Sequence, residues 1–288
     1  MRWIRAPAKI NLTLCVVGRR ADGYHDLESL VAFSGLCDWL AFEPSDDLTL
    51  EVVGPRAYEA GPVDGNIVLR AARSLAAQMP RLRLGRFRLI KRLPAAAGLG
   101  GGSADAAAAL RSLANEAGLP VDDPRVSASA RAAGADVPAC LSPQARTIRG
   151  IGDELGPAIR LPNIFAVLVN PQVKVPTPKV FAALDLKSKT NTGPSSRSSS
   201  AAKSDTAAAL DFGSLGCNDL ENAAIGVAPV IAAVLKRLSE IPEATVTGMS
   251  GSGATCFALF SDRRSAAVAR RTVAAEYPEW WVEATALH

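Results

Sequence analysis

A run of glycines in the middle of the chain constrains the fold more than any other feature. Residues 98–103 read Gly-Leu-Gly-Gly-Gly-Ser, and residues 104–116 are rich in alanine. Glycine destabilises a helix by roughly 1 kcal/mol relative to alanine, the strongest helix former, so this change predicts a tight turn followed at once by a helix. Ser103 is a typical N-cap residue, and Gly118 and Pro120 are typical of a helix end.

The same turn is typical of a phosphate-binding loop. A backbone without Cβ atoms can approach an anion closely, and free N–H groups at a helix N-terminus favour negative charge. A flexible loop before a well-capped helix is the alternative. No GxxxxGK[ST] motif occurs, and Ser103 stands where GxGxxG requires its last glycine, so two better-known nucleotide motifs are absent.

A second candidate lies near the N-terminus, where apolar and polar residues alternate over residues 8–17. The alternation predicts a strand with one buried face and with Lys9 and Asn11 on its polar face. Lysine there could stabilise a phosphoryl group, and asparagine could bind a substrate hydroxyl. Taken alone, the pattern is better explained by the ordinary solvent-facing side of a half-buried strand.

A third candidate is Asp136, between a helix predicted over residues 124–133 and Pro138. Gly134 ends that helix, and proline favours an extended Val137, so Asp136 is expected at a constrained junction. Its carboxylate could accept a proton from an attacking hydroxyl, or it could cap the next segment.

Residues 248–255, Gly-Met-Ser-Gly-Ser-Gly-Ala-Thr, form a second glycine-rich turn. Its glycines permit a tight backbone beside a ligand, and a glycine-rich hairpin is the alternative.

Periodicity and turn residues predict the remaining elements, which mix without a strict βαβ rhythm and favour the α+β class. They are strands at Leu48–Val53, Phe87–Ile90, Phe165–Asn170 and Ala254–Phe260, and helices at Asn66–Gln78, Val227–Leu238 and Ser265–Glu276. Residues 187–207 are serine-rich and nearly devoid of large apolar side chains, which predicts a polar loop.

Composition narrows the function classes. The chain has 288 residues, 48% hydrophobic, with a net charge of +4, and its arginines are spread out, which argues against nucleic acid as a partner. Five separated cysteines without a CxxC pair favour a reduced cytoplasmic protein. Only two histidines occur, which nearly excludes histidine triads and metal–histidine clusters. No apolar run approaches the ~18 residues of a membrane span, so no membrane partner is expected.

Taken together, three motifs in this order resemble the GHMP family of small-molecule kinases. They are Pro7-Ala8-Lys9-Ile10-Asn11-Leu12, the loop at residues 98–103 and the turn at residues 248–255. The resemblance implies an N-terminal S5-like nucleotide-binding domain over residues 1–157 and a C-terminal ferredoxin-like domain over residues 158–288. The active site would lie in the cleft between them.

Four further stretches resemble the family members that use ATP to phosphorylate the 2-hydroxyl of a cytidine diphosphate-linked methylerythritol, in non-mevalonate isoprenoid precursor synthesis. They are Arg20-Ala21-Asp22-Gly23-Tyr24-His25, Gly134-Ala135-Asp136-Val137-Pro138, Val175-Pro176-Thr177-Pro178 and Asn218-Asp219-Leu220-Glu221. The resemblance implies ATP and Mg²⁺ as cofactors and leaves the oligomeric state open.

The resemblance also assigns roles residue by residue. Lys9 and Asp136 match the catalytic positions, with Asp136 as the base. ATP binding falls on Asn66, Pro94, Gly98, Leu99, Gly100, Gly101, Gly102, Ser103 and Ala104. Substrate binding falls on Asn11, Tyr24, His25, Asp136, Thr177 and Phe181. The third glycine motif comprises Gly248, Ser250, Gly251 and Gly253. The metal ligands stay unassigned, with Ser103 as a candidate.

Ala104 is one departure, because family members commonly carry a second serine there. Another GHMP kinase, such as homoserine or mevalonate kinase, is the nearest alternative, and Tyr24, His25 and Phe181 argue against it. A nucleotide-binding protein that has lost catalysis is a further alternative, and the presence of both Lys9 and Asp136 argues against that.

Overall fold

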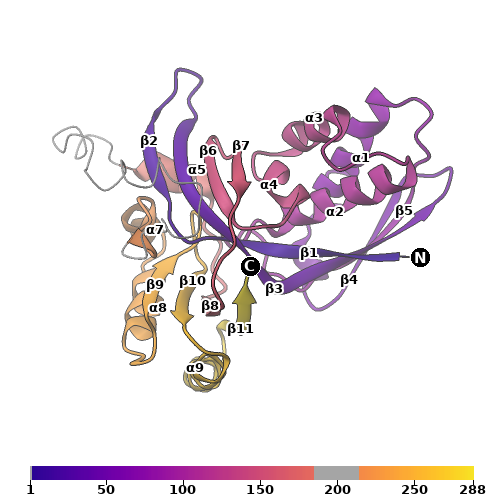
Figure 1. Ribbon diagram of the computed structural model, residues 1–288. Coiled ribbons are helices and arrows are strands. Elements are labelled where there is room, and N and C mark those ends of the chain that lie inside the picture. The colour runs from indigo at the N-terminus through magenta and orange to yellow at the C-terminus, as the bar shows by residue number, and fades with distance from the viewer. Residues whose placement is uncertain (1, 185–213) are drawn as a thin grey trace.

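The computed structural model describes residues 2–184 and 214–288 (Figure 1). The predicted polar loop at residues 187–207 lies outside this part of the chain. In chain order the elements are β1 (Arg2–Asn11), β2 (Cys15–Arg19), β3 (His25–Pro44), β4 (Thr49–Val53), a short 3₁₀ turn η1 (Ala57–Glu59), α1 (Ile67–Gln78), β5 (Gly85–Ile90), α2 (Gly101–Glu116), α3 (Pro124–Ala133), α4 (Val137–Leu141), β6 (Arg146–Gly150), β7 (Glu154–Ala158), β8 (Ile164–Asn170), α5 (Thr177–Ala183), α7 (Glu221–Val227), α8 (Val230–Ser239), β9 (Val246–Met249), β10 (Cys256–Phe260), α9 (Arg263–Glu276) and β11 (Trp281–Leu287).

The long strand β3 connects the two halves of the molecule. It pairs antiparallel with β1 and β5 along its C-terminal part and with β2 and β6 along its N-terminal part. Near its middle, Ser34 pairs with Leu287 of β11, and the backbones of Phe33 and His288 exchange two hydrogen bonds of 2.8 and 2.9 Å. The last residues of the chain are thereby held against the N-terminal half.

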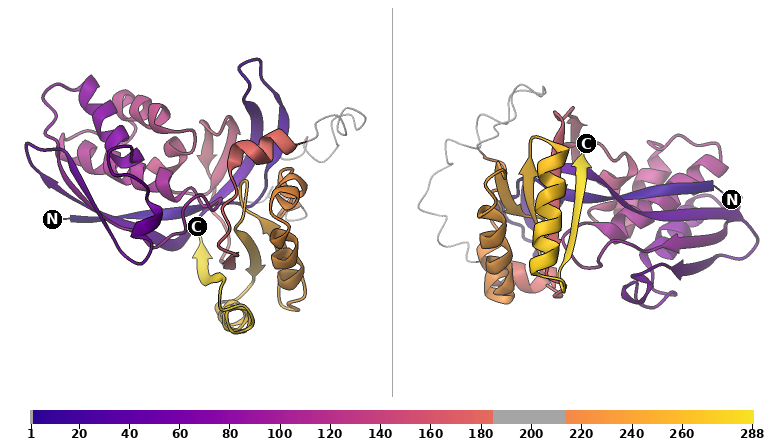
Figure 2. Two further views of the ribbon diagram at one scale, coloured as in Figure 1. Left: turned by 180° about the vertical axis from the view of Figure 1, so that it is seen from behind. Right: turned by 90° about the horizontal axis from the view of Figure 1, so that it is seen from below.

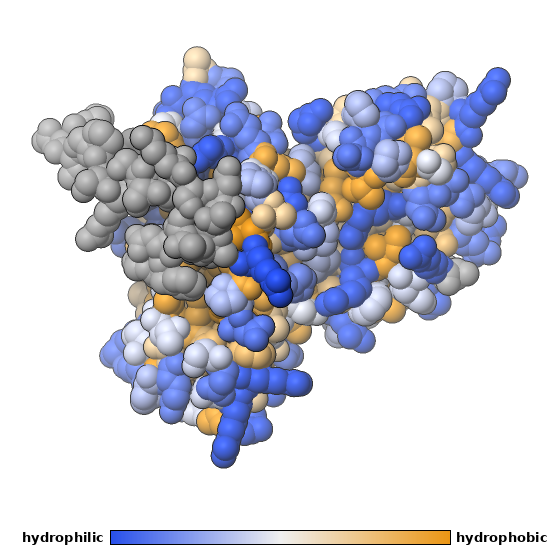
Figure 3. Space-filling model, viewed as in Figure 1, coloured by the Kyte–Doolittle hydropathy of each residue, from blue (hydrophilic) through white to orange (hydrophobic). Residues whose placement is uncertain are grey.

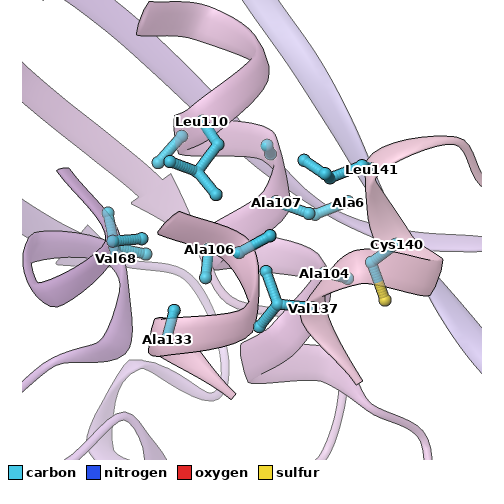
Figure 4. Packing of buried hydrophobic residues seen from close by; sticks show 14 of the residues in the cluster. Ala6, Val68, Ala104, Ala106, Ala107, Leu110, Ala133, Val137, Cys140 and Leu141 are labelled. Carbon is cyan, nitrogen blue, oxygen red and sulfur yellow. The ribbon is translucent and has the colours of Figure 1, made fainter. Parts of the chain in front are cut away.

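Helices α1–α4 cover one face of the N-terminal strands (Figure 1). The alanines of α2 are buried, and small side chains allow the neighbouring helices to pack closely against it. Figure 4 shows Ala106 and Ala107 of α2 between Val68 of α1 and Val137 and Leu141 of α4. The alanine-rich sequence of α2 thus suits the centre of a helical layer.

The C-terminal half is an antiparallel sheet in the order β11-β8-β10-β9. Helices α8 and α9 pack against it, as the two views of Figure 2 show. A separate apolar cluster that includes Phe257, Leu168 and Leu287 also contains Ile10 of β1 and Leu99, so apolar packing continues from one half to the other. The predicted domain boundary after residue 157 falls at the end of β7 and stays a prediction.

Most predicted elements are confirmed with small shifts at their ends. Helix α3 has the predicted bounds, α1 begins one residue after its N-cap Asn66, and α9 begins two residues earlier than predicted. The mixed order of helices and antiparallel strands confirms the α+β class. Strands β3, β6, β7, β9 and β11 and helices α4, α5 and α7 were not predicted.

The single strand predicted over residues 8–17 is wrong. The chain leaves the ladder after Asn11, which pairs with Val31, and resumes at Cys15, which pairs with Glu28 in a hairpin. The prediction of one solvated face is also wrong, because Lys9 and Asn11 are buried.

The predicted start of the central helix at Ala104 is wrong by three residues. Helix α2 begins at Gly101, and its N-cap is Gly100 with a left-handed φ of 60°. Ser103 therefore lies inside the first turn and does not cap the helix. The expectation of an extended Val137 before Pro138 is wrong as well, since Val137 is the first residue of α4.

Two C-terminal predictions need similar corrections. The helix predicted over Val227–Leu238 is α8, which begins three residues later at Val230; Val227 is the last residue of α7, and Pro229 cannot donate the hydrogen bond that would continue α7. The predicted turn at residues 248–253 is shorter, because Gly248 and Met249 belong to β9, and β10 begins only at Cys256.

A buried charge cluster joins the end of β5 to α2. The Lys91 Nζ atom lies 2.6 Å from both Asp38 Oδ2 and Asp105 Oδ2, and all three side chains are at most 4% exposed. Burial alone would lower the pKa of Lys91, but Asp105 and Asp38 together raise it well above its usual value. Burial and the nearby Asp38 raise the pKa of Asp105 to about 7, and Asp105 Oδ1 has no hydrogen-bond partner among the described residues.

We predict that Lys91→Met destabilises the protein by about 3–5 kcal/mol, because it leaves two carboxylates buried without a counter-ion. The free energy of unfolding, measured by urea denaturation, checks this. A loss below about 1 kcal/mol would contradict it.

Asp105→Asn is the matched variant, since it leaves a one-to-one pair of Lys91 and Asp38. A carboxyl whose pKa is raised on folding stabilises the protein below its unfolded pKa, and this contribution is lost as the pH rises through about 7. The stability of Asp105→Asn relative to wild type should therefore increase between pH 5 and pH 8.

Candidate active site

A cavity of about 1090 Å³ lies between the hairpin of β2 and β3, the N-terminus of α2 and helix α5. Residues of both halves line it, among them Lys9, Asn11, Ser29, Asp136, Gly100, Ser103, Thr177, Phe181, Gly251 and Ser252. The molecular surface is mostly hydrophilic in Figure 3, where smaller hydrophobic areas show around the hollow between the two halves.

An ion pair joins two residues that are 127 positions apart in the sequence. The Lys9 Nζ atom donates to Asp136 Oδ1 at 2.8 Å and to Asn11 Oδ1 at 3.2 Å. The Lys9 side chain is 5% exposed, whereas that of Asp136 is 38% exposed. The Asp136 side chain makes no capping hydrogen bond to α4, and Asp136 lines the cavity.

The central glycine loop passes directly over this pair. A Cβ atom on Gly100 would lie 3.3 Å from Lys9 Cε and 4.0 Å from Asp136 Oδ2. The first N–H groups of a helix have no partner within it, so the turn at Gly101, Gly102 and Ser103 can offer donors to an anion in the cavity.

The third glycine motif packs on the central loop. Ser250 Oγ donates to the Gly98 carbonyl at 2.8 Å and accepts from the backbone N–H of Asn11 at 3.0 Å. A Cβ atom on Gly98 would lie 2.2 Å from the Ser250 carbonyl oxygen, and Gly98 also has a φ of 75°. Only glycine fits there without displacing the backbone of the other turn.

Asn218 holds the third motif in place. Its Nδ2 donates to the carbonyls of Met249 at 2.8 Å and Gly251 at 2.7 Å. Its Oδ1 accepts from the Leu220 N–H at 2.9 Å, so the amide orientation is fixed at both ends. The Asn218–Glu221 stretch therefore supports the cavity wall from behind.

Aromatic side chains form the opposite end of the cavity. The rings of His25 and Phe181 stack with centroids 4.8 Å apart and planes 23° apart, although 156 positions separate them in sequence. Burial, and to a lesser extent the charge of Arg19, lowers the pKa of His25, which favours the neutral ring. Tyr24 lines the same end and is 60% exposed, so it is no core aromatic.

Thr177 begins α5 on the same side of the cavity. Its hydroxyl lies 2.8 Å from Ser252 Oγ, which links α5 to the third glycine motif.

The structure brings most of the predicted site residues to one cavity. Its lining includes Lys9, Asn11, Tyr24, His25, Gly98, Gly100, Gly101, Gly102, Ser103, Asp136, Thr177, Phe181 and Gly251. The others do not line it: Asn66, Pro94, Leu99, Ala104, Gly248, Ser250 and Gly253. Leu99 and Ala104 belong to the apolar core, and Asn66 Oδ1 caps α1 by accepting from the Val68 N–H at 2.9 Å.

Sequence reasoning missed several residues of this site. Ser29 lines the cavity as an isolated serine that does not stand out from the pattern around it, and Ser252 lines it from within the predicted 248–255 turn, where it was assigned no role. No sequence pattern around Lys91 indicates its buried ion cluster. Lys91 nevertheless lies beside the loop, since a Cβ atom on Gly101 would be 3.3 Å from its Nζ atom.

No helix among the described residues is long and apolar enough to cross a membrane. Within the same residues, no group of three or more histidine, cysteine, aspartate or glutamate side chains could hold a metal ion.

Two family models match the chain: the GHMP kinases N terminal domain over residues 66–144 and the GHMP kinases C terminal over residues 203–279. Among curated relatives, the 4-diphosphocytidyl-2-C-methyl-D-erythritol kinase of Xanthobacter autotrophicus is 54% identical over 286 residues, covering 98% of each chain. The kinase of the same name from Methylorubrum extorquens is also 54% identical, over 284 residues and 98% of each chain.

Solved structures extend the likeness. A crystal structure of 4-(cytidine 5'-diphospho)-2C-methyl-D-erythritol kinase covers 99% of both chains with a TM-score of 0.80 and 34% identity. Homoserine kinase from Cytophaga hutchinsonii shares the fold, with a TM-score of 0.66 at 17% identity over 97% of this chain and 94% of that one.

The contact between Gly100 and Lys9 gives a testable prediction. Gly100→Ala must adopt a left-handed φ and also push its methyl group against Lys9 Cε, so it should cost more stability than the left-handed φ alone. Gly118→Ala is the matched control, because Gly118 has a φ of 65° with nothing within 4 Å of the added carbon.

Urea denaturation should show a loss of about 1 kcal/mol for Gly118→Ala and a larger loss for Gly100→Ala. Equal losses of stability in the two variants would mean that the Lys9 side chain moves aside without cost and that the loop does not fix its position.

Proposed function

The chain belongs to the GHMP kinase family, and from that premise we propose that it transfers the γ-phosphoryl group of ATP to the 2-hydroxyl of 4-diphosphocytidyl-2-C-methyl-D-erythritol. One observation carries the proposal for this chain: a stacked aromatic pair lies in the same cavity as a lysine–aspartate pair. The first suits a nucleobase and the second suits phosphoryl transfer to an alcohol. The reaction belongs to the non-mevalonate synthesis of isoprenoid precursors.

Asp136 is the proposed base. Its Oδ1 atom accepts from Lys9, so Oδ2 remains to accept the proton of the 2-hydroxyl. The alkoxide oxygen then forms a bond to the γ-phosphorus as the bond between that phosphorus and the β–γ bridging oxygen breaks, which releases ADP. The exposure of the Asp136 side chain supports this role, because the hydroxyl must reach it.

Lys9 is proposed to offset the negative charge on the phosphoryl group in transit. Two of its three N–H bonds go to Asn11 and Asp136 within the described residues, and the third is left for a phosphate oxygen. A buried, oriented ammonium group stabilises developing charge more strongly than one in water.

The glycine loop and the first turn of α2 are proposed to bind the ATP phosphates through backbone N–H groups. Asn66 and Pro94 are proposed to contribute to ATP binding as well.

Mg²⁺ is proposed as the metal cofactor of the reaction. Kinase sites commonly hold Mg²⁺ through one or two protein groups together with substrate phosphates and water. The Ser103 hydroxyl, which lines the cavity, fits that sparse donor set. The ion would supply positive charge that offsets the negative charge of the phosphates.

Cytosine recognition is assigned to His25, Phe181 and Tyr24, with Thr177 and Asn11 binding other parts of the substrate. A neutral His25 can both donate and accept a hydrogen bond at a base edge, which supports this assignment. Homoserine and mevalonate offer no ring to stack, so this end of the cavity favours the cytidine substrate. We further propose a cytoplasmic location, which the wide spacing of the five cysteines and the lack of a CxxC pair support.

The direct test is a coupled assay of ATP turnover with a panel of alcohols. We expect turnover with the cytidine diphosphate substrate and none above background with homoserine or mevalonate. Asp136→Asn should lower turnover roughly 10²–10⁴-fold, because it loses the proton acceptor. Preferred turnover of another alcohol would refute the substrate, and full activity of Asp136→Asn would refute the base.

Phe181→Ala tests the base-binding end. It should raise the KM for the cytidine substrate roughly 5- to 100-fold, which corresponds to a stacking energy of about 1–3 kcal/mol, and leave the KM for ATP unchanged. Phe42→Ala removes an aromatic ring that packs at a tilt against Phe87 away from the cavity, so it serves as the control. A lower melting temperature with an unchanged KM in Phe181→Ala would make Phe181 a packing residue only.

A further inference from the structure

The hydroxyl of Ser29 lies in the floor of the cavity, outside every motif described above. Ser29 is in β3 and is 2% exposed. Its Oγ atom has two partners in different parts of β1 and the turn after it: the backbone carbonyl of Thr13 and the side-chain amide of Asn11, whose Nδ2 lies 2.7 Å away.

The direction of these hydrogen bonds follows from chemistry. A carbonyl oxygen can only accept, so the single proton of the Ser29 hydroxyl goes to Thr13. The Ser29 oxygen is then an acceptor for its other neighbour, which requires Asn11 to present its NH₂ group. The opposite atom of the amide, Asn11 Oδ1, is thereby turned toward Lys9 Nζ at 3.2 Å.

The same series of hydrogen bonds positions Lys9. An ammonium group can only donate, so Lys9 needs acceptors on each side, and it finds them in Asn11 Oδ1 and Asp136 Oδ1. The fixed carbonyl of Thr13 therefore sets the direction of the Ser29–Asn11 hydrogen bond and, through the amide orientation, turns Asn11 Oδ1 toward Lys9.

We propose that Ser29 is a positioning residue for phosphoryl transfer, which orients the Asn11 amide so that Lys9 is held between Asn11 and Asp136. The inference rests on the proposed function, since it concerns the same phosphoryl transfer. Without the hydroxyl, Asn11 Nδ2 is buried with no acceptor at that point, and the amide turns toward the cavity to find one. Lys9 then loses one of its two acceptors and its fixed distance from Asp136.

The test is a double-mutant cycle with Ser29→Ala and Asn11→Ala. Ser29→Ala alone should lower kcat roughly 10- to 100-fold, the scale expected for a misplaced charge, with an unchanged KM for ATP. If Ser29 acts through Asn11, adding Ser29→Ala to Asn11→Ala should change kcat by less than about twofold. Purely structural damage would instead multiply in the double variant.

Ser34→Ala is the matched control. Ser34 is also a buried serine of β3 that donates to a backbone carbonyl, that of Leu36 at 2.9 Å, but it does not line the cavity. It should keep kcat within about twofold of wild type. A wild-type kcat in Ser29→Ala, or independent effects of the two substitutions, would overturn the proposal.

A failure of the proposed function would appear in a different measurement, the substrate preference of the wild-type protein. If wild type phosphorylates a different alcohol, the substrate assignment fails, and the same cycle measured on that alcohol still decides the role of Ser29. If wild type is active and the cycle is additive, only the positioning role fails.

Discussion

The contact between the two glycine turns holds the active cavity together. The Ser250 hydroxyl donates to Gly98 across 152 positions of sequence and accepts from the backbone of Asn11, so one side chain joins the N-terminal strand, the central loop and the third motif. The backbones approach so closely that a Cβ atom on Gly98 would clash with the Ser250 carbonyl. Lys9 lies beneath this junction, with its backbone N–H donating to the Leu99 carbonyl at 2.8 Å. The positions of the charged side chains in the cavity therefore depend on a contact between two uncharged glycine turns.

Two lysines at this junction have different surroundings. Lys9 reaches the cavity and is paired with one half-exposed carboxylate, so its charge is available to a ligand. Lys91 is enclosed with Asp38 and Asp105, and Asp38 Oδ1 also accepts from the Leu93 N–H at 2.8 Å. That cluster fixes the end of β5 against the first turns of α2, which is the helix whose N-terminus faces the cavity. We infer that Lys91 maintains the loop geometry while Lys9 takes part in the chemistry.

Sequence reasoning identified the segments that line the cavity because each has a local signature. The glycine loop, the paired polar residues of β1 and the helix before Gly134 are recognisable from a few neighbouring residues. The helix start at Gly101 was missed because glycine disfavours helices, and here the left-handed Gly100 and packing on Lys91 outweigh that preference. Strand β3 was missed because it is buried along much of its length and shows no simple alternation.

The remaining features depend on contacts between distant segments. The stacking of His25 on Phe181 follows from where the hairpin and α5 meet, and the partners of Ser29 follow from the register of β1 against β3. No single window of sequence carries either arrangement. The resemblance to the GHMP kinases identified the aromatic residues as candidates for substrate binding. Nothing in the sequence indicated the series of hydrogen bonds that ends at Asp136.

Phosphorus NMR of a reaction with ATP and 4-diphosphocytidyl-2-C-methyl-D-erythritol tests the central claim most directly. The account predicts a new phosphomonoester resonance together with ADP, while both resonances of the cytidine diphosphate group persist, because the phosphoryl group is added to the 2-hydroxyl. ADP with inorganic phosphate alone, or loss of the diphosphate resonances, would contradict it.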